Sequence, residues 1–385
     1  MSLYCRPFSP FGKWKNVYKG GVGWYAPALI FQRSNARVDV IMRIMNIESR
    51  NGWFITTSLV LMIAVTVLVG LFLFESDRRL DRPLEKIILA DGQMFLSAPV
   101  YVAQEKGFFR RQGIDLRIQK HATGRDALKA LLDGKADFAT SAETPLIEAA
   151  LNGNKMQVLA TLATTSTDMA IIHSRGKPFI PKDPAVPYLI GTVPDTNSEY
   201  FLELLFLYKG WDLASVQVIP LEPGEMLAAL QSHQIDAAVL WEPQASLIQQ
   251  QLGDGFAIRH DDGIYLWTWN LAGSPETIKM HRPAVVKILK ALRAACHYIR
   301  RNPERSRRMT AAHLGIPESS LKPLWHPFKF SLTITQETLL EMEMQVRWHL
   351  SETSPGRRFN ALSLFATEPL RSLDPDSVTL LRAPS

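Results

Sequence analysis

The sequence predicts an α/β protein of two similar lobes that is preceded by one transmembrane helix. Three observations lead to this fold class. An apolar run without any ionisable side chain covers residues 53–74. Short strand-like and helical runs alternate from about residue 84, and part of this alternation repeats after 99 residues. Strands that alternate with helices form parallel sheets whose faces are covered by the crossover helices.

The charge distribution argues against a nucleic-acid-binding protein. The 385 residues include 43 Lys and Arg and 37 Asp and Glu, which gives a net charge of +6. Residues 1–52 hold eight basic and two acidic side chains and account for the whole excess. Residues 53–385 are neutral, whereas a nucleic-acid binder places its positive excess on the folded surface that meets phosphate. We therefore expect no nucleic-acid partner.

Residues 53–74 form the first predicted element. As a helix these 22 residues reach about 33 Å, enough to cross a hydrocarbon core about 30 Å thick. The basic segment 1–52 precedes the helix, so the positive-inside rule places that segment in the cytoplasm. A buried core helix and a cleaved signal peptide are the alternatives, but the run is apolar on every face and longer than the hydrophobic region of a signal peptide. A true start at Met42 or Met45 rather than Met1 stays open.

The first lobe is predicted element by element after the apolar run. Residues 86–90 read as a strand, and a helix follows over about 99–111. A strand at 116–118, a helix over 125–133 and a strand at 137–140 complete the unit. We assign the shorter runs to strands and the longer runs to helices, because strands need fewer residues than helices.

A shift of 99 residues brings a second unit into register with the first. Six of the sixteen positions from 128 to 143 are identical, and among them Asp137 aligns with Asp236 and Glu143 with Glu242. The order of features also repeats: a helix, an Asp-led strand, and a Glu-containing turn into another helix. Two similar lobes predict a cleft between them, with ligands bound outside the carboxyl ends of the strands.

Two lobes in one chain require two crossovers. We place one crossover near residues 161–166 and the other near 266–273. This predicts one lobe from residues 84–163 plus 272–385, and the other from residues 166–268.

Four loops that follow strands and lead into helices are the candidate binding site. Each offers a small hydroxyl or a glycine before a helix start, whose free N–H groups and positive dipole end favour an anion. The loops lie around residues 95–99, 123–126, 141–144 and 195–198. Ser, Thr, Asp and Asn also cap helices where nothing binds, so capping alone is the alternative for each loop.

Several sequence blocks between about residues 84 and 380 carry a family resemblance. They include Ala98-Pro-Val-Tyr-Val-Ala-Gln-Glu-Lys-Gly-Phe-Phe109, Leu131-Leu-Asp-Gly-Lys-Ala-Asp137 and Ile235-Asp-Ala-Ala-Val-Leu-Trp-Glu-Pro243. In these blocks the chain resembles the periplasmic solute-binding proteins of the nitrate, sulfonate and taurine type, which serve ABC importers. The resemblance implies a type II periplasmic-binding-protein-like fold with two crossovers, which closes on a small solute and presents it to an ABC permease and ATPase.

The resemblance also implies a localisation and a set of partners. Combined with the helix at residues 53–74, it predicts single-pass anchoring in the inner, cytoplasmic membrane and a binding domain in the periplasm. We expect a monomer that binds a small-molecule solute without a cofactor, a metal ion or a catalytic residue.

The same resemblance assigns residues to the cleft. They are Phe95, Ser97, Gly124, Arg125, Ser141, Thr144, Thr196, Asn197, Ser198, Trp241 and Glu242. The family commonly has a small-residue turn where this chain has Asp195, and a carboxylate there repels an oxyanion unless it faces away.

Three kinds of side chain suggest the chemistry of the solute. Arg125 is the candidate for a sulfonate or carboxylate, since a guanidinium can donate two parallel hydrogen bonds, although an arginine that faces solvent is an equal alternative. Glu143 and Glu242, which the repeat aligns, can contact an amine-bearing ligand or hold the turn. Trp241 can stack on a flat ligand or pack beside the hinge.

Two other functions stay open. A ligand-sensing receptor without transport also explains an anchored binding domain. A homologue of the synthase that makes the thiamine pyrimidine shares this fold, but that family carries a cysteine-rich iron-binding motif, and only Cys296 follows the apolar run. The nine histidines show no ligand spacing and no nucleophile elbow is present, so we predict a protein that is not an enzyme.

Overall fold

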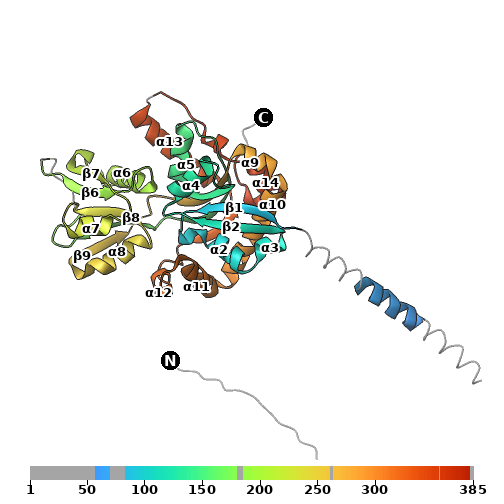
Figure 1. Ribbon diagram of the computed structural model, residues 1–385. Helices are drawn as coiled ribbons and strands as arrows, with labels where there is room; N and C mark the ends of the chain where they lie inside the picture. Colours follow the sequence, from blue (N-terminus) through green and yellow to red (C-terminus); the bar gives the residue numbers. More distant parts are fainter. Residues whose placement is uncertain (1–56, 70–82, 180–184, 261–262, 355, 382–385) are drawn as a thin grey trace, which may run out of the picture. The chain divides into compact units, whose positions relative to one another are not determined.

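The computed structural model describes residues 57–69, 83–179, 185–260, 263–354 and 356–381 (Figure 1). Residues 57–69 are helical and do not belong to the compact unit that residues 82–385 form. Among the described residues, no helix has both the length and the apolar character that a membrane crossing needs. The predicted segment 1–52 and the two ends of the predicted transmembrane helix, 53–56 and 70–74, fall outside the described residues.

Six strands form the first sheet, in the order β11-β4-β10-β3-β1-β2. Strand β1 runs parallel to both β2 and β3, whereas β10 is antiparallel to β3 and β4, and β11 is antiparallel to β4. The bounds are β1 Glu85–Asp91, β2 Ile114–Lys120, β3 Phe138–Ala142, β4 Gln157–Thr165, β10 Trp267–Gly273 and β11 Lys329–Thr333.

Five strands form the second sheet, in the order β7-β6-β8-β5-β9. Strand β6 runs parallel to β7 and β8, and β5 is antiparallel to β8 and β9. The bounds are β5 Met169–Ser174, β6 Tyr188–Thr192, β7 Val216–Pro220, β8 Ala237–Trp241 and β9 Phe256–His260. The predicted two-lobe α/β fold is confirmed, and each lobe is built on one of these sheets.

The internal repeat makes the same contact in both lobes. Asp137 precedes β3, and its carboxylate accepts a hydrogen bond of 2.7 Å from the backbone N–H of Ile88 in β1. Asp236 precedes β8 in the same way and accepts a bond of 2.9 Å from the backbone N–H of Leu189 in β6. Both strands that follow, β3 and β8, are buried along their whole length, as expected for central strands of an α/β sheet.

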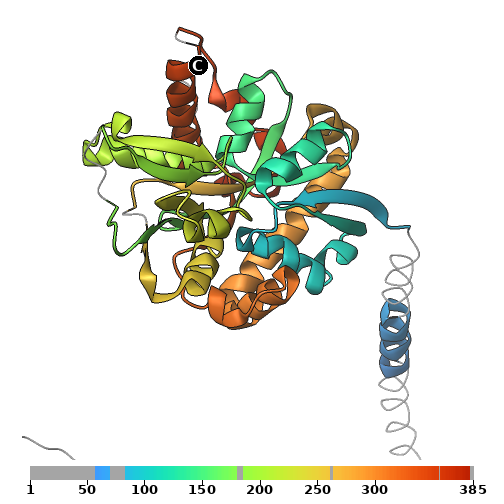
Figure 2. The same ribbon diagram turned by 60° about the vertical axis from the view of Figure 1, so that its left-hand side comes forward.

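Helices surround the two sheets (Figures 1 and 2). The second sheet carries α6 Asn197–Lys209, α7 Met226–Gln231 and α8 Gln244–Leu252. The first lobe holds α2 Ala98–Glu105, α3 Phe108–Arg111, α4 Gly124–Leu132, α5 Glu143–Leu151, α9 Pro275–Met280, α10 Arg282–Arg301, α11 Pro303–Leu314, α12 Glu318–Leu321, α13 Gln336–Thr353 and α14 Thr367–Leu373. A short 3-10 helix, Phe95–Ser97, joins β1 to α2.

The chain passes between the sheets twice, after β4 and again after β9. The first passage takes only residues 166–168, and the second ends where β10 begins at Trp267. The second lobe was predicted to end at residue 268 and the first to resume at residue 272. Strand β10 spans both positions and belongs to the first sheet. The passages bring the carboxyl ends of β3 and β8 and the starts of α4 and α6 to the space between the lobes.

Candidate functional site

A small cavity of about 20 Å³ lies between the two lobes, and it has room for roughly one water molecule. Both lobes line it, and the lining residues are Met94, Thr123, Gly124, Arg125, Ala142, Pro145, Thr196, Asn197, Trp241, Trp267 and Trp269. Five of the predicted site residues are among them: Gly124, Arg125, Thr196, Asn197 and Trp241. The described structure is therefore closed over the predicted site.

Two helices begin at this cavity. Helix α4 starts at Gly124 after the N-cap Thr123, whose hydroxyl accepts a bond of 3.1 Å from the backbone N–H of Asp126. Helix α6 starts at Asn197 after the N-cap Thr196, whose hydroxyl accepts a bond of 3.2 Å from the N–H of Ser198. Each helix presents its positive dipole end to the cavity from a different lobe, which favours a negatively charged group between them.

Glycine at position 124 is required by close packing. A Cβ atom there would lie 2.9 Å from the Trp269 ring and 3.1 Å from the Cα of Ser141. The first turn of α4 thus lies directly against β3 and β10.

Three tryptophan side chains, Trp241, Trp267 and Trp269, form the aromatic wall of the cavity. The ring centroids of Trp241 and Trp267 are 6.5 Å apart, and those of Trp267 and Trp269 are 6.3 Å apart. Trp269 donates its indole N–H to the hydroxyl of Ser97 at 2.7 Å. The indole N–H groups of Trp241 and Trp267 are buried and have no hydrogen-bond partner among the described residues. Buried donors without a partner are rare in folded proteins, so these two are available to a ligand.

The buried carboxylate of Asp91 supports the aromatic wall through Ser97. Asp91, at the end of β1, accepts hydrogen bonds from the hydroxyls of Ser97 at 2.5 Å, Tyr101 at 2.5 Å and Thr140 at 2.7 Å. Ser97 in turn accepts the indole N–H of Trp269. The predicted site residue Ser97 thus lies one layer below the cavity and orients a residue that lines it.

Four other predicted residues also lie around the cavity rather than on its surface. Phe95 is buried and packs edge-to-face on Phe328, with ring centroids 4.4 Å apart. The hydroxyl of Ser198 donates to the carbonyl of Val239 at 2.8 Å. The remaining two are Ser141, whose buried hydroxyl has no partner in the described part of the chain, and Thr144, which donates to Gln345 at 2.8 Å.

The first predicted carboxylate, Glu143, is fully buried at the start of α5. It accepts hydrogen bonds from the backbone N–H of Thr268 at 2.8 Å, from the Thr268 hydroxyl at 2.7 Å and from the hydroxyl of Tyr265. Burial raises the pKa of Glu143 to about 8, against the opposing effect of the Thr268 hydrogen bond. Glu143 thus joins β3 to the returning strand β10.

The second predicted carboxylate, Glu242, follows β8. It accepts hydrogen bonds from the backbone N–H and the hydroxyl of Ser246 at 3.1 and 2.8 Å, and it pairs with Nε2 of His260 at 2.6 Å. The hydrogen bond to Glu242 raises the pKa of His260, although burial acts in the opposite direction. The two glutamates that the repeat aligns occupy corresponding positions and are both held by protein groups.

We expect Glu143→Gln to flatten the pH dependence of stability. The native carboxyl keeps its proton up to about pH 8, whereas the unfolded carboxyl ionises near its ordinary value of 4.5. Between these values the native state binds more protons, so this contribution to the free energy of unfolding is complete below the unfolded pKa and decreases as the pH rises toward the native one. Urea unfolding at a series of pH values across this window checks the prediction. The same dependence of the free energy of unfolding on pH in the wild type and in Glu143→Gln would contradict it.

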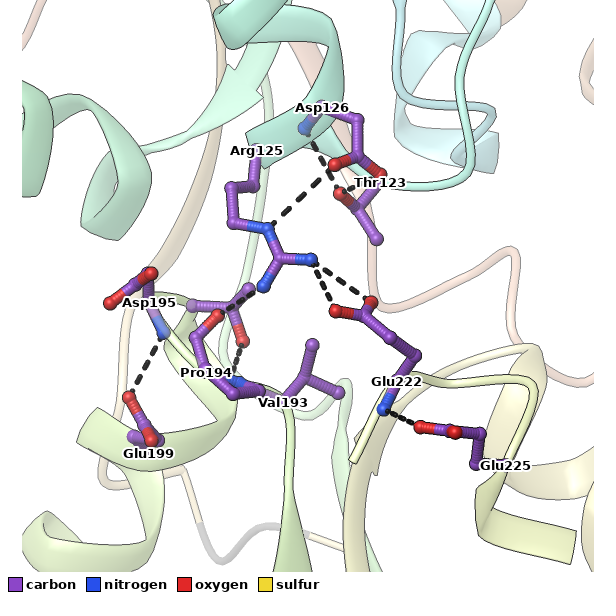
Figure 3. Close-up of polar contacts among 10 residues, drawn as sticks. Thr123, Arg125, Asp126, Val193, Pro194, Asp195, Glu199, Glu222 and Glu225 are labelled. Atoms are coloured by element: carbon purple, nitrogen blue, oxygen red, sulfur yellow. Dashed lines mark hydrogen bonds and ion pairs between the residues drawn. The ribbon is translucent and has the colours of Figure 1, made fainter. Parts of the chain in front are cut away.

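Arg125, the predicted anion ligand, bridges the two lobes (Figure 3). One guanidinium nitrogen donates to both carboxylate oxygens of Glu222, at 2.7 and 2.9 Å, and another donates to the carbonyl of Pro194 at 2.7 Å. Arg125 comes from α4 of the first lobe, whereas Glu222 and Pro194 belong to the second. The guanidinium charge is thus satisfied by protein groups at the rim of the cavity.

This arrangement predicts that Arg125 supports closure of the lobes rather than direct binding. Arg125→Ala and Glu222→Gln should each weaken solute binding by about threefold, because partly exposed ion pairs contribute at most about 1 kcal/mol. Parallel titrations of the two variants check this. If Arg125 contacts the solute directly, Arg125→Ala will weaken binding strongly, and Glu222→Gln will leave it unchanged or strengthen it.

Several site residues were not predicted from the sequence. Trp267, Trp269 and Met94 line the cavity. Asp168 does not line it but lies in the first passage between the lobes. Both carboxylate oxygens of Asp168 are buried without a partner in the described part of the chain, and burial followed by repulsion from Glu242 raises its pKa well above the ordinary value. The alternation Trp-Thr-Trp at 267–269 was the available signal, because it places two large rings on one face of a strand.

Two α/β lobes that close on a small cavity with aromatic walls and free hydrogen-bond donors define a two-lobe solute-binding protein. The chain belongs to the family described as NMT1/THI5 like, whose family model matches residues 95–306. This assignment agrees with the resemblance found in the sequence. The chain is a binding protein and not an enzyme.

Individual relatives and structures agree with this family. The chain is 26% identical to the taurine-binding periplasmic protein of Escherichia coli over 176 residues, which cover 44% of this chain and 52% of that protein. It is 23% identical over 244 residues to a Brucella abortus protein that is named for an inferred binding function, covering 63% of this chain and 74% of the relative. The alkanesulfonate-binding protein SsuA of Xanthomonas axonopodis pv. citri bound to MOPS has the same fold, with a TM-score of 0.62, 14% identity, and coverage of 73% of this chain and 98% of that one.

Proposed function

We propose that this protein captures a small oxyanion, of the sulfonate, nitrate or taurine type, between its two lobes and delivers it to an ABC importer. The observation that carries the proposal is the pair of buried, unpartnered indole N–H groups of Trp241 and Trp267 at the cavity. An indole nitrogen can only donate, so its natural partner is an acceptor such as a sulfonate or nitrate oxygen.

The surroundings of these donors support an anion with a small apolar part. The starts of α4 and α6 add two positive dipole ends from opposite lobes. The tryptophan rings and Met94 offer apolar surface for a short alkyl group, although the lobes must lie further apart than in the described structure to admit it, because the cavity holds about 20 Å³. A solute that contacts both lobes stabilises the closed state, which is the form that a transporter can recognise.

We also propose that residues 53–74 anchor the chain in the inner membrane, with residues 1–52 in the cytoplasm and the two lobes in the periplasm. The support is the absence of ionisable side chains over the run, together with exposed apolar side chains such as Val60, Leu61 and Leu68 in helix 57–69. Fractionation of cells that produce the full chain tests this. Recovery in the membrane pellet after a carbonate wash is expected, and recovery in the wash would contradict it.

Titration calorimetry of the full chain in mild detergent tests the solute class. Ethanesulfonate, taurine and nitrate are the probes, and ethylene glycol is the uncharged control. We expect at least one oxyanion to bind and to raise the unfolding temperature, because a ligand that binds only the native state stabilises it. Binding of none of the three oxyanions would contradict the proposal.

A further inference from the structure

A second and larger hollow lies on another side of the interlobe boundary. Its volume is about 390 Å³, within the range of small-molecule sites. Helices α5 and α13 of the first lobe form one wall, and β6, α6 and β7 of the second lobe form the other. We call this hollow the acidic groove; it shares only Thr196 with the tryptophan cavity.

Four carboxylates line the acidic groove, and they come from both lobes. Glu148 projects from α5, whereas Asp195, Glu199 and Glu203 come from the start of α6 and its next turn. His349 of α13 is the one basic residue among the described lining residues, and its Nδ1 pairs with Glu148 at 2.9 Å. The groove therefore has an excess of negative charge.

The carboxylates act on one another across the lobe boundary. Burial raises the pKa of Glu148, and the Asp195 carboxylate adds to the rise, whereas His349 lowers it. Burial also raises the pKa of Glu199, and the neighbouring carboxylates of the groove contribute to that rise. Closing the lobes thus gathers like charges, and a bound cation would relieve their repulsion.

An independent observation indicates a ligand. Thr192, at the end of β6, lines the groove, is fully buried, and its hydroxyl has no hydrogen-bond partner among the described residues. A buried hydroxyl without a partner carries a desolvation cost. A ligand N–H in the groove would satisfy this oxygen.

The remaining lining residues indicate the shape of the ligand. Leu202, Leu213, Val216 and Val218 form an apolar strip beside the carboxylates. The side chain of Trp348 also lines the groove and donates its indole N–H to Glu203 at 2.6 Å. The described residues contain no cluster of three or more His, Cys, Asp or Glu arranged to hold a metal ion. Carboxylates from both lobes beside apolar side chains suit an organic cation with a hydrocarbon segment.

We propose that the acidic groove binds a linear aliphatic diamine that spans the two lobes. One ammonium group neutralises carboxylates of the second lobe, the other approaches Glu148 of the first, and the alkyl segment lies along the apolar strip. A hydroxyl acceptor such as Thr192 completes the hydrogen bonding of one ammonium group. This site is separate from the oxyanion site, and its occupation favours the closed state.

Calorimetric titration of the full chain with 1,4-diaminobutane tests the proposal. The double variant Glu148→Gln/Asp195→Asn keeps side-chain size, and asparagine tolerates the positive φ of 54° at position 195. We expect about tenfold weaker diamine binding in this variant, since Gln and Asn still accept hydrogen bonds from the ammonium groups and only the charge of the two carboxylates is lost. The control Glu105→Gln/Glu276→Gln removes two exposed carboxylates elsewhere and should bind the diamine like the wild type.

Thr192→Val provides a second variant that does not depend on charge. It removes a hydroxyl that has no protein partner, so the fold is expected to keep or gain stability while diamine binding weakens about threefold. Butane-1,4-diol is the uncharged probe and should not bind. The proposal would be overturned if Glu148→Gln/Asp195→Asn and Thr192→Val bind the diamine as tightly as the wild type. It would also be overturned if the control variant loses as much diamine affinity as Glu148→Gln/Asp195→Asn.

Titrations of the same variants with ethanesulfonate separate the two sites. If ethanesulfonate binds at the tryptophan cavity, the groove variants should bind it at least as tightly as the wild type, because loss of groove carboxylates lowers the repulsion in the closed state. Loss of diamine binding alone identifies the groove as its site. A wild type that binds ethanesulfonate but not the diamine refutes only the groove proposal. A wild type that binds the diamine but none of ethanesulfonate, taurine and nitrate refutes only the oxyanion site.

Discussion

Replacing both free indole donors, in the double variant Trp241→Phe/Trp267→Phe, is expected to weaken oxyanion binding by about a hundredfold. A hydrogen bond to a charged group contributes about 1.5–3 kcal/mol, so two of them account for a loss of this size. The fold should be retained, because phenylalanine keeps an aromatic ring in each place and neither N–H bonds to a described residue. Calorimetric titration with the oxyanion that binds the wild type measures the effect.

Trp211→Phe is the matched control for this experiment. Trp211 packs against Phe206 and Phe179 in the second lobe, with ring centroids 5.4 and 5.8 Å away, and does not line the cavity. Its variant should bind the oxyanion with wild-type affinity. Wild-type affinity in the double variant as well would show that the indole N–H groups do not bind the solute.

The second large effect concerns stability. Asp91→Ala should lower the free energy of unfolding by about 3 kcal/mol, because it leaves several buried hydroxyl donors without their acceptor. The hydroxyls affected are those of Ser97, Tyr101 and Thr140, all within 2.7 Å of the Asp91 carboxylate. Urea unfolding measures the change.

Asp115→Ala tests whether that loss is specific. Asp115 lies in the neighbouring strand β2 and is only partly buried. Its replacement should cost less than about 1 kcal/mol, as for most surface substitutions. Similar losses in the two variants would mean that the hydrogen-bond network around Asp91 is not the source of the stability.

The order of elements could be predicted because each depends on local pattern. The strand expected at 86–90 is β1, and the helix expected over 125–133 is α4, each within one residue at either end. The repeat was informative because Asp137 and Asp236 make the same backbone contact in both lobes. The helix expected over 99–111 is instead two helices, α2 and α3, because Gly107 adopts a left-handed conformation with a φ of 66° between them.

The cavity could be predicted only where its residues follow a strand in the repeated unit. Gly124 and Asn197 were found because they begin helices after strands. Trp267 and Trp269 were missed because their strand, β10, lies between β3 and β4 in the first sheet although it is distant from both in sequence. Local sequence carries no information on such a long-range antiparallel pairing.

The role of Arg125 shows the same limit. Its charge and its place at a helix start pointed to an anion, but its partner Glu222 lies 97 residues away in the other lobe. The position of that partner follows from how the lobes close, which depends on the two passages between the sheets. A pairing of this kind becomes visible only in the folded chain.

A crystal structure of the full chain grown with ethanesulfonate is the most direct test of the oxyanion site. We predict the sulfonate between the starts of α4 and α6, with its oxygens accepting hydrogen bonds from Nε1 of Trp241 and Nε1 of Trp267. A sulfonate bound outside the tryptophan cavity, or bound there with both indole N–H groups still unpaired, would contradict the account.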